Sequence, residues 1–303
     1  MVTLRDEGDR KRGANVSSLL VAKVLNNNVI IADHPQYEEV VVIGKGIGFN
    51  RKARDVIPLD VVEKMFILTN QQEQEQYKQL AVQIDERIIE VINEIIYYIN
   101  SESKTPLNEH IHIALTDHIA FAIKRAEQGM TIQNPFLYET REMYPLEYKL
   151  AAHALEIIHD KLGVALEEDE IGFVALHIYS ALTDQHITAI KADSRLIADM
   201  VKVIEDSLKI SITGDTLDYS RLLTHLRFAI ERIRRGEKVA ATHRLEEMLK
   251  MEYPEVYSLS WKLTKMMEKR LRRPVYKAEV SYLTMHLQRF VEKREEEEES
   301  TQQ

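Results

Sequence analysis

The hydrophobic positions of this chain change their period once, near residue 71. Before that point, short apolar runs rich in valine and isoleucine are separated by turn-forming residues, a pattern typical of β-strands. The runs centre on Val21, residues 29–31, residues 40–43 and residues 64–68. They predict a four-stranded antiparallel unit of about fifty residues. Because so small a sheet buries little core, we expect this unit to dimerise.

Beyond residue 71 the apolar positions follow the 3.6-residue period of amphipathic helices. Ile84, Ile88, Ile92 and Ile99 begin this pattern, which continues to about residue 294 with breaks at proline and glycine positions. A long break at residues 183–194 divides the helical part into two similar halves. The predicted fold is therefore multidomain: a small antiparallel β N-terminal domain followed by two duplicated all-α helical-bundle domains.

The two halves repeat one another in sequence. His118 recurs as His225, 107 positions later, together with matching Phe-Ala-Ile, arginine and glycine positions. His177 recurs as His286, 109 positions later, in matching segments that begin with glutamate. Each half therefore holds a pair of histidines, 59 residues apart in the first half and 61 in the second. This repeated pairing makes the four histidines the first candidates for chemistry.

Composition places the chain among soluble globular proteins. Of its 303 residues, 45% are apolar and 29% are charged, which are ordinary values. The sequence contains no run of eighteen apolar residues, so we expect no membrane insertion. The lack of cysteine excludes disulfides and thiolate sites and fits a cytoplasmic protein. The net charge of −9 argues against a chain that coats nucleic acid along its whole length, but not against a small nucleic-acid module.

Histidine offers one chemistry that suits a repeated, paired arrangement. Neutral imidazole is a nucleophile near neutral pH and can carry a phosphoryl group. Phosphorylation adds about −1.5 to −2 charge, which is enough to change the packing of a helix or domain interface. Arg125 and Arg232 each follow a histidine by seven residues and share its helix face. Either arginine is a candidate phosphate partner, and either is equally a plain surface residue.

Two further interpretations of the histidines stay open at this point. Each histidine is also compatible with a satisfied core or interface position. A metal site is the second possibility, because His110 and His112 lie close to His118 in sequence. However, residues 110 and 112 do not share a helix face and have no counterparts in the second half. The sequence has no phosphate-binding glycine loop, nucleophile elbow or HExxH motif, so we expect neither an enzyme nor a cofactor.

The segment from Gly44 to Arg54 combines three glycines, Phe49 and four basic residues. RNA recognition uses stacking on aromatic rings, guanidinium contacts and close backbone approach in this combination. The asparagines at positions 26–28 are candidates for reading base edges. The alternative is a hairpin in which asparagines only form turns and the charges are solvated. Basic and acidic residues balance at six each over residues 19–70, so any basic surface is local.

These segments resemble a known family. Residues 22–29 (Ala-Lys-Val-Leu-Asn-Asn-Asn-Val) and 44–49 (Gly-Lys-Gly-Ile-Gly-Phe) are similar to the signatures of the RNA-binding CAT domain in the BglG/SacY/LicT transcriptional antiterminators. Residues 115–119 and 175–177 are similar to those of the first PTS regulation domain (PRD), where PTS is the sugar phosphotransferase system. The resemblance covers residues 19–294, and residues 108–118 are most similar to the glucose-type branch.

The resemblance implies a domain order and an RNA target. It implies a CAT domain at 19–74, PRD1 at 75–186 and PRD2 at 190–294. The polar residues 1–18 predict a disordered leader, and the run of glutamates predicts an acidic disordered tail at 295–303. A CAT homodimer would bind an antiterminator hairpin in the nascent leader mRNA and prevent the overlapping terminator from forming. The implied RNA-binding residues are Lys23, Asn26, Asn28, Gly44, Lys45, Gly46 and Phe49. Lys45 stands where many family members carry arginine.

The resemblance also implies how the activity is controlled. The sugar permease, enzyme II, would phosphorylate His118 or His177 when the sugar is absent. Resemblance to the glucose-type branch implies that this sugar is glucose. The carrier protein HPr would phosphorylate His225 or His286. The competing hypotheses are a PRD-containing DNA-binding transcriptional activator and a histidine-dependent phosphotransfer enzyme. The first is disfavoured because no helix-turn-helix pattern precedes the repeats, and the second because no catalytic machinery is visible beside the histidines.

Overall fold

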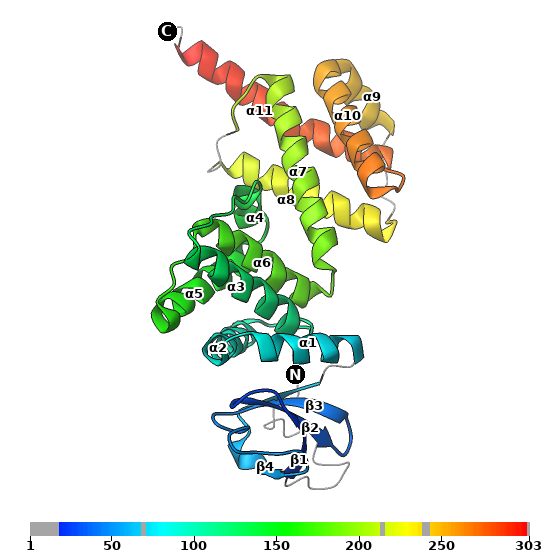
Figure 1. Ribbon diagram of the computed structural model, residues 1–303. Helices are drawn as coiled ribbons and strands as arrows, with labels where there is room; N and C mark the ends of the chain where they lie inside the picture. The colour runs from blue at the N-terminus through cyan, green and yellow to red at the C-terminus, as the bar shows by residue number, and fades with distance from the viewer. Residues whose placement is uncertain (1–17, 68–70, 213–215, 238–242, 302–303) are drawn as a thin grey trace. The chain divides into compact units, whose positions relative to one another are not determined.

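The computed structural model describes residues 18–67, 71–212, 216–237 and 243–301 (Figure 1). The chain divides into two compact units. The first holds the chain up to Gln133 together with Leu146–Gln185, and the second holds Asn134–Pro145 and the chain from His186 onward. The predicted disordered leader lies outside the described residues, apart from its last position.

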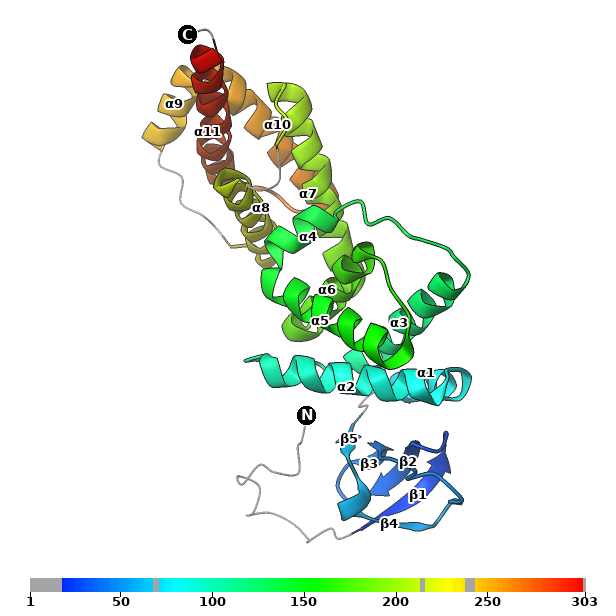
Figure 2. The same cartoon turned by 90° about the vertical axis from the view of Figure 1, so that its left-hand side faces the viewer.

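The N-terminal sheet has five strands, which are β1 (Ser18–Val24), β2 (Val29–His34), β3 (Glu38–Ile43), β4 (Val56–Pro58) and β5 (Lys64–Phe66). Their order is β4-β1-β2-β3-β5, with antiparallel pairing throughout (Figure 2). The prediction of four strands was therefore wrong by one. The missed strand, β4, is only three residues long and ends at a proline, too short for an alternating pattern, and proline is confined to edge strands such as this one.

Helices follow from residue 71 onward, as the change of period predicts. They are α1 (Gln71–Gln83), α2 (Glu86–Glu102), α3 (Ile111–Glu127), α4 (Leu137–Met143), α5 (Pro145–Leu162), α6 (Glu168–Thr183), α7 (Ile187–Leu208), α8 (Leu217–Arg235), α9 (His243–Glu252), α10 (Pro254–Leu271) and α11 (Lys277–Thr301). Several begin at recognisable signals. The side chain of Asp85 accepts a bond from the Arg87 backbone N–H at the start of α2, and α5 and α10 begin at Pro145 and Pro254.

Both faces of the sheet are apolar, which explains why the strands lack an alternating pattern. One face packs against helices α1, α2 and α3 of the same chain; its core contains Leu25, Val29, Ile31, Val41, Ile43, Tyr77, Ala81, Ile89 and Ile113. The other face is built around Leu19, Val21, Ile30, Ala32, Val40, Val42, Ile47 and Ile57. Helices of the same chain thus cover one apolar face of the sheet, which the sequence analysis expected a second copy of the chain to cover. The dimer stays a prediction.

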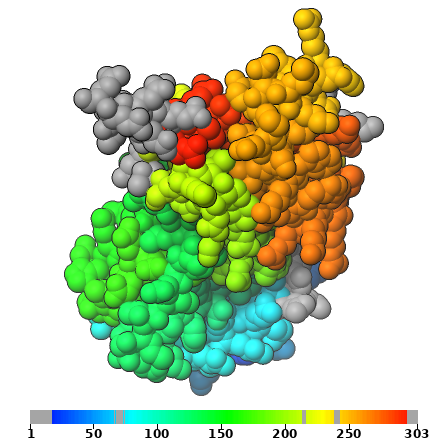
Figure 3. Space-filling model, turned by 90° about the horizontal axis from the view of Figure 1, so that it is seen from above, coloured from blue at the N-terminus to red at the C-terminus, as the bar shows by residue number. Residues whose placement is uncertain are grey.

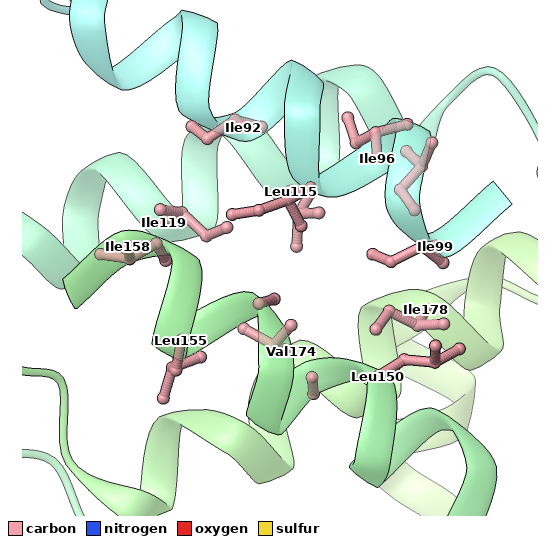
Figure 4. Packing of buried hydrophobic residues seen from close by; sticks show 14 of the residues in the cluster. Ile92, Ile96, Ile99, Leu115, Ile119, Leu150, Leu155, Ile158, Val174 and Ile178 are labelled. Carbon is pink, nitrogen blue, oxygen red and sulfur yellow. The ribbon is translucent and has the colours of Figure 1, made fainter. Parts of the chain in front are cut away.

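Helices α2, α3, α5 and α6 share one hydrophobic core in the first unit (Figure 4). Ile92, Leu115, Ile158 and Val174 come from these four helices in turn and are almost fully buried. Figure 4 shows their side chains, with those of neighbouring isoleucines and leucines, pointing toward a common centre. This packing fixes the rotation of α3 and α6, and therefore decides which of their polar residues meet.

The second unit is built from α7, α8, α10 and α11, with α9 and α4 packed on them. In Figure 3 the orange helix α10 lies directly against the yellow-green α7. Although α4 precedes α5 in sequence, it packs on α7 and α8: Tyr219 donates to Glu139 at 3.3 Å, and Arg227 donates to the Met143 carbonyl at 3.0 Å. The segment 134–145, which falls inside the predicted PRD1 range, therefore belongs to the second compact unit.

The C-terminal acidic run differs from its prediction. Helix α11 continues to Thr301, so the glutamates at 295–299 are helical rather than part of a disordered tail. Glutamate is a strong helix former, and the helix that precedes the run provides the nucleus from which it can extend.

Candidate nucleic-acid interface and histidine centres

The glycine-containing loop after β3 is bonded to the turn between β1 and β2. The Gly44 N–H donates to the Asn28 carbonyl at 3.1 Å, and the Gly48 N–H donates to the Asn27 carbonyl at 2.8 Å. The Asn28 side chain accepts a further bond from the Gly46 N–H at 2.7 Å. Two segments that are separate in sequence thus form one surface, held by hydrogen bonds from the loop backbone.

Two of the glycines are required by close packing. A Cβ atom on Gly44 would lie 2.4 Å from the Val61 carbonyl oxygen, and one on Gly48 would lie 2.2 Å from the Asn26 carbonyl oxygen. Both distances are far shorter than a van der Waals contact. Both neighbours are backbone atoms, which cannot move aside as the end of a flexible side chain can. The sequence signature of this loop therefore has a structural cause: Gly48 allows the loop to lie against the β1–β2 turn, and Gly44 allows it to lie against the backbone at Val61.

The loop presents one aromatic ring and several cations to solvent. Ile47 is buried beneath it, while Phe49 is 62% exposed. The cations Lys45, Arg51, Lys52 and Arg54 are all exposed, and so is Lys23 on β1. The structure brings together the predicted residues Asn28, Gly44, Lys45, Gly46 and Phe49, and it offers the stacking surface and local positive charge that single-stranded or looped RNA requires.

The asparagines have structural partners. The Asn26 side chain accepts from the Asn28 N–H at 3.0 Å and donates to the Ala81 carbonyl of α1 at 3.2 Å. Asn27 donates from its backbone and its side chain to Glu86 of α2, at 2.7 and 3.3 Å. The turn-forming role suggested by the sequence is thus real for these residues. The bonds use only part of the hydrogen-bonding capacity of the Asn26 and Asn28 amides, since each amide has two N–H donors and two acceptor lone pairs.

The first histidine centre lies between α3 and α6. His118 Nε2 is 3.1 Å from Glu170 Oε2, Arg125 donates to the other oxygen of Glu170, and the rings of His118 and His177 are 4.9 Å apart. Because Arg125, late in α3, meets Glu170, early in α6, the two helices run antiparallel here. Glu170 is only 4% exposed.

The second centre repeats this arrangement between α8 and α11. Arg232 donates two hydrogen bonds to Glu279, from Nε to Oε1 at 3.0 Å and from Nη2 to Oε2 at 2.8 Å. His225 Nε2 lies 3.7 Å from Glu279 Oε2, and the rings of His225 and His286 are 4.6 Å apart. Glu279 is 2% exposed. The structure thus joins the two predicted histidines of each repeat, although they are about sixty residues apart in sequence.

Burial and charge set the protonation of these groups. Desolvation, followed by the charges of His286 and Arg232, lowers the pKa of His225 to about 3. Desolvation, followed by Arg289 and Arg221, also lowers the pKa of His286. Desolvation alone would raise the pKa of Glu170, but the close contact and charge of His118 and the hydrogen bond and charge of Arg125 outweigh it and lower that pKa. The second pair is therefore neutral near pH 7, the form in which imidazole is nucleophilic.

Sequence reasoning missed the two glutamates. Glu170 and Glu279 each precede a paired histidine by seven residues, and they recur 109 positions apart like that histidine. That spacing equals the spacing from His118 to Arg125 and was a usable signal. The surface interpretation of Arg125 and Arg232 is wrong, because both guanidinium groups hold these buried carboxylates.

The metal-site interpretation of the histidines finds no support. The described part of the chain contains no group of three or more histidine and acidic residues arranged to hold a metal ion. His110 pairs with Glu73 at 3.2 Å, whereas His112 is buried, and desolvation, followed by the charge of Lys64, lowers its pKa to about 3. These two histidines therefore belong to the packing around α3 and not to the His118 centre.

Among the described residues, no helix is both long and apolar enough to span a membrane.

Comparison with known proteins gives a consistent result. The family model of the CAT RNA binding domain matches residues 19–75, and that of the PRD domain matches residues 93–181 and 198–290. The PtsGHI operon antiterminator of Bacillus subtilis is 49% identical over 276 residues, covering 91% of this chain and 98% of that protein. Protein GlcT of Staphylococcus saprophyticus is 39% identical over 279 residues, covering 91% and 99%. The crystal structure of GlcT CAT-PRDI is 55% identical, with a TM-score of 0.51, and covers 55% of this chain and 99% of that one.

A first prediction tests the glycine loop. We expect Gly48→Ala to destabilise the sheet by about 1–3 kcal/mol, because the loop must shift to relieve the overlap with Asn26. Hydrogen exchange of the amides in β1, β2 and β3, followed by mass spectrometry, should accelerate accordingly. Gly163→Ala is the control: its position has a positive φ of 68° but no atom within 4 Å, so it should leave exchange in the sheet unchanged. Equal exchange in both variants would contradict the packing argument.

A second prediction concerns pH. The pKa of His225 lies near 3 in the folded chain against an ordinary value of 6.5, so between these values the unfolded chain binds the proton more readily. The free energy of unfolding of the second unit should therefore fall as pH falls below 6.5, by about 1.4 kcal/mol per unit from this group. Urea unfolding followed by fluorescence of Trp261 in α10, the single tryptophan, measures it. A His225→Gln variant should show a weaker pH dependence, and an identical dependence would refute the assignment.

Proposed function

Because this chain belongs to the family of transcriptional antiterminators that carry a CAT RNA-binding domain and PRD domains, we propose that it binds an RNA hairpin in a nascent leader mRNA and prevents the overlapping terminator from forming. The protein is a regulator rather than an enzyme. Its relatives include an antiterminator named for the PtsGHI operon and proteins named GlcT, which supports glucose as the sugar to which it responds.

The observation that carries the RNA proposal is the loop between β3 and β4. It exposes Phe49 and four cations while its backbone is fixed to the β1–β2 turn by three hydrogen bonds to Asn27 and Asn28. A surface fixed before binding loses little conformational entropy when RNA is bound. We assign RNA contact to Lys23, Asn26, Asn28, Gly44, Lys45, Gly46 and Phe49, with two CAT domains acting as a homodimer.

The physical action on transcription is a shift between two RNA structures. Antiterminator and terminator hairpins share nucleotides, so only one of them forms in a given transcript. A protein that binds one structure and not the other stabilises it by mass action. The DNA-binding hypothesis gains no support, because the N-terminal domain is a sheet that matches the CAT RNA binding domain.

Control by the sugar phosphotransferase system would act at the histidine centres. We propose that enzyme II modifies His118 or His177, and that HPr modifies His225 or His286. In each transfer the lone pair of a ring nitrogen forms a new P–N bond while the bond from phosphorus to the donor protein breaks. The donor's leaving group takes up the proton that the ring releases, so charge and atoms balance. The added phosphoryl charge enters a largely buried site beside a carboxylate, where it alters helix packing.

The RNA surface yields a third prediction. Phe49→Ala should weaken binding of the leader hairpin about five- to 150-fold, because loss of one base-stacking contact is worth about 1–3 kcal/mol. Fluorescence anisotropy with the full chain and a labelled leader hairpin measures the change. Phe121→Ala is a matched control, since Phe121 on α3 is 59% exposed but lies outside the CAT domain. Unchanged affinity in Phe49→Ala would remove this ring from the interface.

Charge gives a second readout on the same surface. Lys45→Ala should reduce the slope of log affinity against log salt concentration by about 1, provided that this lysine contacts a phosphate. If the slope does not change while affinity falls, Lys45 contacts a base or acts only through the fold of the loop.

A fourth prediction concerns the switch. His118→Ala should leave the protein active in the absence of sugar, since the proposed inhibitory phosphoryl group has no acceptor. A reporter gene placed behind the leader terminator, with and without glucose, measures this. His110→Ala is the control, because that exposed histidine pairs with Glu73 outside the centre and its loss should preserve sugar response. If His118→Ala remains sugar responsive, His177 or another residue carries the signal.

A further inference from the structure

Each histidine pair shares its site with a carboxylate and an arginine in the same order in both repeats. On α3 and α8 the histidine comes first and the arginine follows seven residues later. On α6 and α11 the glutamate comes first and the histidine follows seven residues later. Seven residues are about two helical turns, so each helix presents two polar groups on one face. Antiparallel packing then brings all four groups together.

The glutamates are placed where a carboxylate is costly. Glu170 and Glu279 are 4% and 2% exposed, and burying a charge removes solvation that a salt bridge only partly replaces. Apolar residues of similar size often stabilise such a position as well or better. Stability alone therefore gives a weak reason for this arrangement. The shared feature of the two sites is instead an anion held by arginine beside a nucleophilic ring.

We propose that Arg125 and Arg232 each form a phosphoryl-binding position that Glu170 and Glu279 fill in the unmodified protein. When a histidine of the same centre is phosphorylated, the arginine releases the carboxylate and binds the phosphoryl group of that histidine instead. This inference rests on the proposed phosphorylation of these histidines and adds to it the groups that receive the phosphoryl charge. Arg125 and Arg232 are positioning residues, and the glutamates are the groups that they release.

A phosphoryl group on His118 and the carboxylate of Glu170 compete for the same space. His118 Nε2 and Glu170 Oε2 are 3.1 Å apart, so a phosphoryl group on Nε2 would occupy the space of that carboxylate. Two anions cannot share the position without strong repulsion. Glu170 must therefore move away, while the guanidinium, which matches phosphate oxygens as well as carboxylate oxygens, stays beside an anion. The first turn of α6, where Glu170 lies, also favours negative charge.

The histidine centres also have unused hydrogen-bonding capacity. In the described part of the chain, Glu170 Oε2, His118 Nε2 and His225 Nε2 are buried and lack a hydrogen bond of good geometry. The contact between His118 and Glu170 is therefore one of charge and distance without alignment. Buried polar atoms usually have hydrogen-bond partners. The atoms that lack one here indicate that a group absent from the unmodified chain can bind at this site.

The exchange changes which helices the arginine connects. Before modification, Arg125 on α3 is bonded to Glu170 on α6, so the bond joins two helices. After modification of His118, both the phosphoryl group and Arg125 belong to α3, and the bond between helices is lost. Modification of His177 on α6 would instead leave the new bond between helices. The identity of the modified histidine thus determines whether the pair of helices is released or retained.

The two repeats differ in how firmly the carboxylate is held. Arg232 donates two hydrogen bonds to Glu279, and His225 is farther from it, at 3.7 Å. Arg125 donates one to Glu170, which also lies close to His118. We therefore expect the exchange to occur more readily in the first repeat, and the test begins there.

The test compares Glu170→Gln with Arg125→Gln in the full chain. After labelling by phosphorylated PTS proteins and removal of the donor, the half-life of label on the peptide that carries His118 is measured. Glu170→Gln removes the competing anion and should lengthen the half-life about tenfold, whereas Arg125→Gln removes the phosphoryl partner and should shorten it about tenfold. Lys124→Gln, an exposed neighbour, should leave it unchanged.

The opposite signs distinguish this exchange from a purely structural ion pair. Both substitutions break the same contact, so a structural role would shift the half-life in the same direction in both variants, and that result would overturn the inference. In the second repeat, Arg232→Gln should shorten the half-life on His225, but Arg234→Gln should not. Arg234 on the same helix also makes a two-bond pair, with Asp193, but that pair faces no histidine of the centre.

A measurement on the unchanged protein covers the case in which a variant fails to fold. Phosphorus NMR of the labelled full chain gives the second pKa of the phosphoryl group, which pairing with arginine should lower relative to the same protein in urea. Equal values in both states would overturn the inference. If the unchanged chain takes no label on any of the four histidines, the proposed phosphorylation itself is wrong, and that outcome is separate from the comparison of variants.

Discussion

The contact on which both helical repeats converge is a buried carboxylate between an arginine and a histidine. It forms only if two antiparallel helices pack with a fixed rotation, and the apolar side chains set that rotation. In the first unit, Leu115 and Ile119 of α3 and Val174 and Ile178 of α6 belong to one core. The polar groups lie at the edge of that packing, close enough to the surface for His118 to remain partly exposed. A change in the polar contact therefore acts directly on the packed helices.

The sheet applies the same principle to a different purpose. Its loop surface is stabilised from below by buried Ile47 and from the side by hydrogen bonds to the β1–β2 turn. The exposed groups carry no part of this stabilisation, which leaves Phe49 and the cations available for a ligand. In both places the apolar core holds backbone positions, and the functional groups are presented on them. The asparagines belong to the supporting set as well as to the candidate contacts.

Sequence alone predicted most of the architecture, because the hydrophobic period and the internal repeat are visible in the sequence without knowledge of how the helices pack. The change near residue 71, the duplicated helical halves and the four histidines all follow from it. Strand β4 was missed because its three residues are too few to establish a hydrophobic pattern. The role of Glu170 was missed because it meets Arg125 across 45 residues of sequence. The seven-residue spacing to His177 placed Glu170 on the same helix face as that histidine, but the packed orientation of the helices shows which arginine it meets. The packing of α4 on α7 and α8 was likewise invisible, since it joins segments that are far apart in sequence.

The seven-residue spacing within each helix has a consequence for the length changes that the chain tolerates. In the second repeat His225 and Glu279 are 54 positions apart, whereas in the first His118 and Glu170 are 52 positions apart. These two extra residues fall between the paired helices, where α9 has 10 residues and α4, at the same place in the first repeat, has 7. A single residue inserted between His118 and Arg125 would rotate one relative to the other by about 100° and separate the four groups. Insertions are thus compatible with this fold in its connections and incompatible with it inside four short helical intervals.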